Sequence, residues 1–273
     1  MGLEPTFAIP QLHGRWDVDL VSEATIHSKS ETKNTESKSL AQTGVVIIGR
    51  NEGERLKRSL LSVKATGVPF VYVDSGSTDG SQQLAVDLGA ILIELDLSTP
   101  FTAARARMAG FHRLMKEHTD LDTVQFLDGD CEISANWLSS AQAVLAADPT
   151  CAIVCGVLHE RNPEQSVYNR LCQLEWRKPP GKVDSCGGIF LARTEALIQS
   201  GGFDTTLIAG EEPELCLRLR AQQWTIRSIA EPMARHDAAM TEFGQWWNRT
   251  VRAGFGYAQG YSCLLYTSDA ADE

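Results

Sequence analysis

The sequence lacks an apolar run long enough to span a bilayer, and its N-terminus lacks the apolar segment of a signal peptide. We therefore expect a protein that is soluble or only peripherally bound to a membrane. The seven cysteines include no C-x-x-C pair and no zinc-ligand spacing, which argues against a structural zinc site and indicates a reducing compartment. Together these absences predict a cytoplasmic protein, with the inner face of the membrane as a compatible location.

The sequence also lacks an excess of basic residues. It has 25 Lys and Arg against 35 Asp and Glu, which gives a formal net charge of -10. Nucleic-acid-binding proteins usually carry a basic surface, so this balance argues against a nucleic-acid partner. No G-x-G-x-x-G follows the first predicted strand, which argues against a Rossmann dehydrogenase. An acidic chain is compatible with a site that recruits a divalent cation.

What the sequence does contain is a regular alternation of short apolar segments and amphipathic segments, which predict strands and helices respectively. The alternation predicts an α/β fold with a mostly parallel sheet and helices on both faces, in which ligands bind at the carboxyl ends of the strands. We predict strands at residues 45–48, 70–73, 91–95, 124–127, 152–157, 188–192 and 224–229. We predict helices at residues 54–65, 81–88, 103–116, 137–147, 194–200, 213–222 and 242–259.

Composition divides the chain into three parts. Residues 1–43 are predicted to be an N-terminal extension and a polar linker, because residues 22–43 are rich in Ser, Thr, Lys and Glu and have little to bury. Residues 44–260 are predicted to form a single α/β domain. Residues 261–273 do not continue the preceding helical pattern, and their ending resembles a translated sequencing-adapter tail. We therefore expect a tail that is foreign to the native chain, with an ordinary frayed terminus as the alternative. We expect residues 263–273 to be dispensable and poorly ordered.

Acidic side chains follow two of the predicted strands. The turn after the second strand reads Asp-Ser-Gly-Ser-Thr-Asp-Gly at residues 74–80, where an acid can accept hydrogen bonds from a base or a ribose, or polar side chains can cap the next helix. Asp128-Gly129-Asp130 follows the fourth strand, and two carboxylates one residue apart can hold a hard cation. In an ordinary surface turn such acids are only solvated. Their position after a buried strand favours a divalent metal that neutralises a departing nucleoside diphosphate.

Two further groups occur in the second half of the chain. Glu211 and Glu212 precede the predicted helix at residues 213–222, where acids either stabilise the helix dipole or supply a general base for an acceptor hydroxyl. His236 follows the last predicted strand, and it is either a structural residue or an imidazole ligand that completes a metal site.

Taken together, these motifs resemble those of the family 2 glycosyltransferases with the GT-A fold, a Rossmann-like nucleotide-binding domain. The resemblance covers about residues 44–260, with several motifs in the family's order. Asn51-Glu52 resembles the family's opening Asn-Glu, and Glu211-Glu212 lies where the family commonly has Glu-Asp. Met108 stands where the family usually has Asn. The other matching segments are residues 74–80, 105–110, 128–130 and 187–190.

The resemblance implies an inverting, hexosyltransferase-type reaction between a nucleotide-diphosphate-sugar donor and an acceptor hydroxyl, assisted by Mn²⁺ or Mg²⁺. The acceptor would be a saccharide, a lipid-linked molecule or a small molecule. The implied donor-binding residues are Glu52, Asp74, Ser75, Asp79, Arg105, Arg107 and Asp128. The implied metal ligands are Asp130, Asp128 and His236. Glu212 inherits the role of general base, with its neighbour Glu211 as the alternative.

Two other functions fit part of the sequence. A sugar nucleotidyltransferase also combines an α/β sheet with a metal, but it needs a glycine-rich phosphate loop with a lysine, and residues 49–53 match this poorly. A catalytically silent nucleotide- or sugar-binding module is the other alternative, and the presence of all the acids argues against it. A donor-hydrolysis assay distinguishes these functions.

The last predicted helix carries Trp246, Trp247, Arg249 and Arg252. An aromatic and basic helix is typical of interfaces and membrane surfaces. If the native chain continues past this helix, we expect a peripheral membrane contact here.

Overall fold

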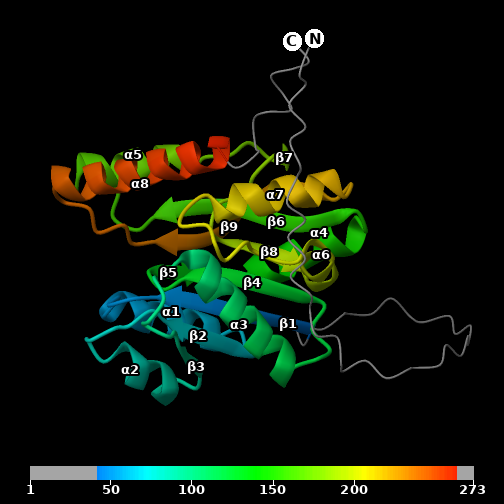
Figure 1. The fold of residues 1–273 in the computed structure, drawn as a ribbon, viewed down its shortest axis with the longest axis horizontal. Coiled ribbons are helices and arrows are strands. Elements are labelled where there is room, and N and C mark those ends of the chain that lie inside the picture. The colour runs from blue at the N-terminus through cyan, green and yellow to red at the C-terminus, as the bar shows by residue number, and fades with distance from the viewer. Residues whose placement is uncertain (1–41, 263–273) are drawn as a thin grey trace, which may run out of the picture. The chain divides into compact units, whose positions relative to one another are not determined.

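The computed structural model describes residues 42–262. The predictions for residues 1–41 and 263–273, which make up most of the N-terminal extension and of the tail, lie outside the described residues. The described residues form one nine-stranded mixed sheet with helices packed on it (Figure 1). The strands are β1 Thr43–Gly49, β2 Phe70–Asp74, β3 Ile91–Glu94, β4 Thr123–Asp128, β5 Cys131–Ile133, β6 Cys151–Glu160, β7 Gly181–Lys182, β8 Phe190–Arg193 and β9 Thr225–His236. The helices are α1 Glu54–Lys64, α2 Ser81–Asp87, α3 Ala103–Glu117, α4 Trp137–Ala147, α5 Val167–Glu175, α6 Thr194–Ser200, α7 Glu211–Ala221 and α8 Phe243–Ser262.

The strand order is β3-β2-β1-β4-β8-β6-β9-β5, with β7 paired to β9. The first four strands in this order are parallel, as the alternation of strands and helices predicts. β8 is antiparallel to both of its neighbours, β4 and β6, whereas β6 and β9 are parallel. The predicted α/β class is confirmed. The carboxyl ends of β1, β2 and β4 therefore open on the same edge of the sheet.

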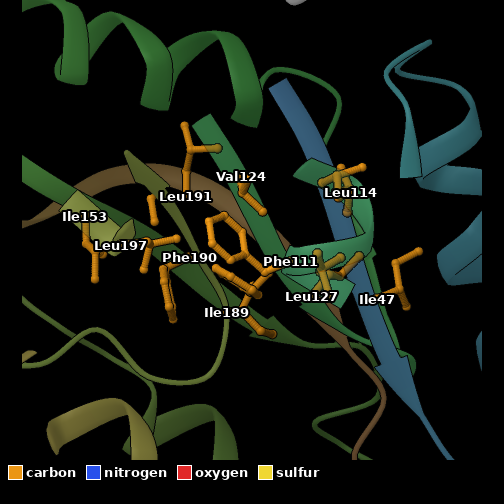
Figure 2. Packing of buried hydrophobic residues seen from close by; sticks show 14 of the residues in the cluster. Ile47, Phe111, Leu114, Val124, Leu127, Ile153, Ile189, Phe190, Leu191 and Leu197 are labelled. Atoms are coloured by element: carbon orange, nitrogen blue, oxygen red, sulfur yellow. The ribbon is translucent and has the colours of Figure 1, made fainter. Parts of the chain in front are cut away.

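The core spans the sheet and the helices packed on it, and one part of it lies where α3 packs against β1 and β2. Figure 2 shows Phe111 of α3 in one cluster with Leu127 of β4 and Phe190 of β8. A close approach of helix and sheet depends on Gly110, because a Cβ atom there would lie 2.4 Å from Cγ1 of Val46. This packing holds α3 over β1 and fixes the helix that carries Arg107.

Three elements of the described residues were not predicted: β5, α5 and β7. β5 has only three residues and β7 only two, so neither shows a period. β9 runs past the predicted end at residue 229 and includes Pro232, which pairs with Val157 next to a shift in register. A proline is accommodated at such an irregularity because no regular ladder hydrogen bond is required there. This extension is what carries His236 to the site.

Helices α5 and α8 lie side by side (Figure 1). Tyr168 of α5 stacks on Trp246 of α8 with ring centroids 6.2 Å apart, and Arg249 forms an ion pair of 2.6 Å with Glu175. Within residues 42–262, no helix is both long enough and apolar enough to cross a membrane.

Candidate active site

The predicted acids come together at the edge where β1, β2 and β4 end. In the strand register Gly49 of β1 pairs with Asp74 of β2, and Ile48 pairs with Asp128 of β4. β9 reaches the same edge, because its last residue, His236, pairs with Cys131 of β5. Side chains from distant parts of the sequence therefore share one site, as expected at the carboxyl ends of parallel strands.

The loop after β1 is tied to the loop after β2 by several hydrogen bonds. Asn51 adopts a left-handed backbone with φ 56, a conformation that Asn tolerates better than most residues. Its N–H donates to Ser77 Oγ at 2.8 Å, and its Oδ1 accepts from the N–H of Thr78 at 2.7 Å. The N–H of Gly53 donates to Asp79 Oδ2 at 3.0 Å. Asp79 thus holds the two loops together, and its contact with a donor stays a prediction.

Asp74 is buried, and its carboxylate accepts four hydrogen bonds from the protein. Oδ1 accepts from the hydroxyl of Tyr72 at 3.1 Å. Oδ2 accepts from the N–H groups of Gly76 at 2.9 Å and Ser77 at 2.7 Å, and from Nε2 of Gln82 at 3.0 Å. In this structure Asp74 therefore shapes the turn that follows β2. Direct contact of Asp74 with a base or ribose also stays a prediction.

Carboxylates crowd around the turn Asp128-Gly129-Asp130. Gly129 permits the crowding, because a Cβ atom there would lie 3.2 Å from Cγ of Glu52. Burial and then the charge of Asp130 raise the pKa of Glu52 to about 7, although Arg55 opposes this shift from 2.7 Å away. Several negative groups in so small a volume repel one another. The turn is thus an environment that favours a bound cation.

Asp130 and His236 face each other across the β5–β9 pair. Oδ2 of Asp130 lies 3.2 Å from Nε2 of His236, and Oε2 of Glu160 lies 3.7 Å from Nδ1 on the other side of the ring. Burial alone would lower the pKa of His236, but the two carboxylates raise it to about 10. The ring of Trp176 packs edge-on against the imidazole at 4.5 Å between centroids. The Cys131 thiol donates to Oδ1 of Asp130 at 3.3 Å.

Arg107 links two of the predicted acids. Its side chain is almost fully buried; Nη2 donates to Oδ1 of Asp128 at 3.0 Å and Nη1 donates to Oε1 of Glu211 at 2.5 Å. The backbone of Gly188 packs against the contact between Arg107 and Asp128, because a Cβ atom at this position would lie 2.7 Å from Nη2 of Arg107. Arg107 therefore lies at the site with its donors directed at protein acids.

Arg105 contacts the exposed loop before α3, and Ser75 contacts the end of β1. Nη1 of Arg105 donates to the backbone oxygens of Thr99 at 2.8 Å and Pro100 at 2.6 Å, so this guanidinium braces an exposed loop. The N–H of Ser75 donates to the oxygen of Gly49 at 3.0 Å. The structure does not bring Arg105 to the acids that Arg107 joins.

Glu211 and Glu212 point into different surroundings, although they are adjacent at the start of α7. Oε1 of Glu211 is engaged by Arg107. Oε1 of Glu212 accepts a hydrogen bond from the backbone N–H of Cys186 and another from the Cys216 thiol at 3.1 Å. Glu212 is therefore held beneath the segment that leads to Gly187 and β8, whereas Glu211 belongs to the Arg107 pair.

A cavity of about 290 Å³ opens beside these residues. Its wall includes Asp128 and His236, which lie near Asp130, and Cys186, whose N–H contacts Glu212. Trp176, Lys178 and Arg249 line the wall near α5 and α8. The sequence motifs did not indicate Trp176 or Lys178, and they indicated Arg249 only as part of an interface or membrane contact. A signal existed for α5, since Ser166 caps the helix by accepting a hydrogen bond from the N–H of Asn169 at 3.0 Å.

The side chains around Asp130 fit a divalent cation such as Mn²⁺ or Mg²⁺. Carboxylate oxygens suit both ions, and an imidazole is compatible with Mn²⁺. Among the described residues, the partner of Nδ1 of His236 is Oε2 of Glu160 at 3.7 Å, beyond hydrogen-bond distance. Oε2 of Glu52 is buried and is held by an ion pair with Arg55. A cation would relieve the mutual repulsion of the carboxylates and replace the proton between Asp130 and His236.

Comparisons with known proteins identify the family and the fold. The family model described as glycosyl transferase family 2 matches residues 44–198. The chain is 30% identical over 141 residues to a TPR repeat-containing protein of Synechococcus elongatus, covering 51% of this chain and 33% of that protein. It is 26% identical over 219 residues to a pre-mycofactocin glycosyltransferase of Mycobacterium tuberculosis, covering 74% of this chain and 44% of that protein. The chain thus spans less than half the length of these relatives.

A solved structure shares the fold. The mannosyltransferase PcManGT from Pyrobaculum calidifontis, in complex with GDP-Man and Mn²⁺, superposes with a TM-score of 0.57 at 17% identity. The match covers 81% of this chain and 64% of that chain. The predicted GT-A fold is confirmed.

Proposed function

The chain belongs to glycosyl transferase family 2, and we propose that it transfers a hexosyl group from a nucleotide-diphosphate sugar to an acceptor hydroxyl with inversion at the anomeric carbon. The observation that carries this proposal is the cavity itself, which has Asp128 and His236 on one side and the Cys186–Glu212 contact on the other. The names of two similar proteins support it, since one is a glycosyltransferase and the other a mannosyltransferase in complex with GDP-Man and Mn²⁺.

We place the cation at Asp130 and His236, with Asp128 as a further ligand or as a contact to the ribose. When bound, Mn²⁺ or Mg²⁺ neutralises the charge that develops on the leaving nucleoside diphosphate. Glu160 orients the imidazole from the opposite side of the ring, because its Oε2 lies 3.7 Å from Nδ1. A carboxylate behind a ligating histidine is a common second partner for a metal site.

We assign the general base to Glu212, which would take the proton of the acceptor hydroxyl as its oxygen attacks the anomeric carbon. The contact with the N–H of Cys186 fixes the carboxylate behind the cavity wall. Glu211 is the weaker candidate, because Arg107 already holds its Oε1. Positioning of Glu212 by a backbone donor leaves the orientation of the base insensitive to side-chain changes at Cys186.

We place the donor nucleoside over the joined loops after β1 and β2. Glu52 and Ser75 border this surface, and Asp74 and Asp79 hold its shape through their hydrogen bonds. Arg107 lies near the diphosphate position and would exchange part of its contact with Asp128 or Glu211 for a phosphate oxygen. The outer Arg105 is assigned a role in the loop that flanks the donor.

We place the acceptor, a saccharide, a lipid-linked molecule or a small molecule, in the cavity beside Trp176. A peripheral membrane contact at the inner face of the cytoplasmic membrane is part of this proposal, and α8 supports it. Four apolar residues recur along α8 at every fourth position and are half exposed or more: Phe243, Trp247, Val251 and Phe255. Such a stripe suits the interface between water and lipid.

The proposed function is tested with a panel of nucleotide-diphosphate sugars and acceptor hydroxyls. Release of the nucleoside diphosphate is measured with and without Mn²⁺, and NMR reports the anomeric configuration of the product. We expect metal-dependent release with one preferred donor and inversion of configuration. Donor binding without turnover on any acceptor, including water, would favour a silent binding module. A product with retained configuration would overturn the direct displacement by Glu212.

A further inference from the structure

Cys186, Glu212 and Cys216 form a compact buried cluster next to the proposed site. Their exposed fractions are 5%, 6% and 0%. The two Sγ atoms are 3.7 Å apart, Oε1 of Glu212 lies 3.1 Å from Sγ of Cys216, and one ligand atom from each residue lies within 4.8 Å of the others. Cys186 comes from the segment before β8, and the other two residues lie one turn apart on α7.

The spacing of the sulfur atoms matches that of two ligands on one tetrahedral ion. Zn–S bonds of about 2.3 Å at a tetrahedral angle place two sulfurs about 3.8 Å apart. A carboxylate lies beside the two sulfurs, because Oε1 of Glu212 accepts from the Cys216 thiol and from the backbone N–H of Cys186. Cys186 also lines the 290 Å³ cavity, so an ion has a path to the cluster from solvent.

We propose that Cys186, Glu212 and Cys216 form a second metal site, specific for thiophilic divalent cations such as Zn²⁺ and Cd²⁺, and separate from the site at Asp130. Each thiol releases its proton to solvent when its sulfur binds, so the bound group is one divalent cation with two thiolates and one carboxylate. A water molecule from the cavity that Cys186 lines would supply a fourth ligand. Mg²⁺ prefers oxygen ligands and is excluded by the two sulfurs.

Occupation of this second site would inhibit transfer, a consequence that rests on the proposed role of Glu212. The carboxylate that receives the acceptor proton becomes a metal ligand and loses its basicity. The binding of the cation itself does not depend on that role. A thiophilic cation would therefore act as an inhibitor at low concentration even when Mg²⁺ saturates the site at Asp130.

The binding is tested with Co²⁺, whose bonds to thiolates give an intense near-ultraviolet charge-transfer absorption. The background variant Asp130→Ala removes the first metal site, so the remaining signal reports the second. We expect this variant to show the thiolate absorption and bind one Co²⁺. Adding Cys216→Ser or Cys186→Ser should remove the absorption and weaken binding by at least about tenfold. Adding Cys151→Ser, which changes another buried thiol, should leave both unchanged.

Two outcomes would overturn the site. The first is the absence of thiolate absorption in Asp130→Ala, and the second is an absorption that survives both serine substitutions. Inhibition is measured separately as the Zn²⁺ concentration that halves each variant's own rate in excess Mg²⁺. We expect Cys216→Ser to need about tenfold more Zn²⁺ than Cys151→Ser. If the two variants are equally sensitive to Zn²⁺ while the cobalt experiment gives the expected result, the metal site stands and the role of Glu212 as general base is contradicted.

Discussion

Arg107 and Glu211 are joined by a hydrogen bond of 2.5 Å from Nη1 to Oε1, although they come from α3 and α7 and are 104 positions apart in the sequence. The same guanidinium binds Asp128 at 3.0 Å, so one buried cation connects the end of β4 to the helix that carries Glu212. Arg107 thus helps to set the position of the proposed metal ligands after β4 relative to the proposed general base, Glu212.

Replacing Arg107 by Met should destabilise the fold strongly, because two acids would lose a buried cation. Breaking a buried ion pair by removing one partner costs about 3–5 kcal/mol. Arg113→Met is the matched control, since Arg113 lies on the same helix in an exposed pair with Glu117, where about 0–1 kcal/mol is expected. Urea unfolding measures both free energies. An equal decrease in the free energy of unfolding of the two variants would show that the buried ion pairs of Arg107 stabilise the fold no more than an exposed pair does.

Gly110 is expected to tolerate no larger residue. In Gly110→Ala the new methyl group would lie 2.4 Å from Cγ1 of Val46, so α3 must move away from the sheet. Overpacking of this kind costs about 1–3 kcal/mol. Gly254→Ala is the control within a helix, because nothing lies within 4 Å of its Cβ position, and it should gain up to about 1 kcal/mol. A thermal-unfolding comparison in which Gly110→Ala is the more stable variant would contradict the close packing of α3.

The parallel half of the fold was predictable because its strands and helices alternate with clear periods. The strands 45–48, 70–73, 91–95 and 124–127 correspond to β1–β4 with ends that differ by at most two residues. β9 extends beyond its predicted end because tertiary pairing with β6 and β5 carries the chain through Glu231 and Pro232, residues that locally indicate a turn. The residue pattern of one segment cannot show which other strands it pairs with.

The site was predictable only in part. The order of the motifs along the sequence indicated that acids such as Asp74 and Asp128 belong to the site. The carboxyl ends of β1, β2 and β4 bring these acids together. Local sequence does not show that the carboxylate of Asp74 is occupied by protein donors, or that the adjacent Glu211 and Glu212 face different partners. Trp176 was not predicted as a site residue. It directly follows α5, a helix that packs against β6 and α8.

Glu212→Gln should keep donor binding and lose most transfer, by about 10²–10⁴-fold, because the amide keeps the shape and removes the basicity. Glu211→Gln is the matched control, and its loss should be smaller because Glu211 serves as a partner of Arg107. Single-turnover transfer and equilibrium donor binding are measured for both. If Glu211→Gln is the inactive variant and Glu212→Gln retains its rate, the base is Glu211.

The apolar stripe on α8 should bind lipid. Replacing both Phe243 and Trp247 by Ser should reduce sedimentation with vesicles of mixed neutral and anionic phospholipids, because both side chains are more than half exposed and lie one turn apart. Ile198→Ser is the control for an exposed apolar residue on another helix. Sedimentation that is absent in the unmodified chain, or equal in the variants, would contradict the membrane contact.

The most direct test of the central claim is the metal dependence of donor binding in Asp130→Ala. Calorimetry with the preferred nucleotide-diphosphate sugar is performed with Mn²⁺ and after its removal by EDTA, in the unmodified chain and in the variant. Asp87→Ala, which alters an exposed acid on α2, is the control. We predict that Mn²⁺ strengthens donor binding in the unmodified chain and in Asp87→Ala, and that Asp130→Ala binds the donor equally weakly with and without Mn²⁺. Full metal-stimulated binding in Asp130→Ala would contradict a cation held by Asp130 and His236.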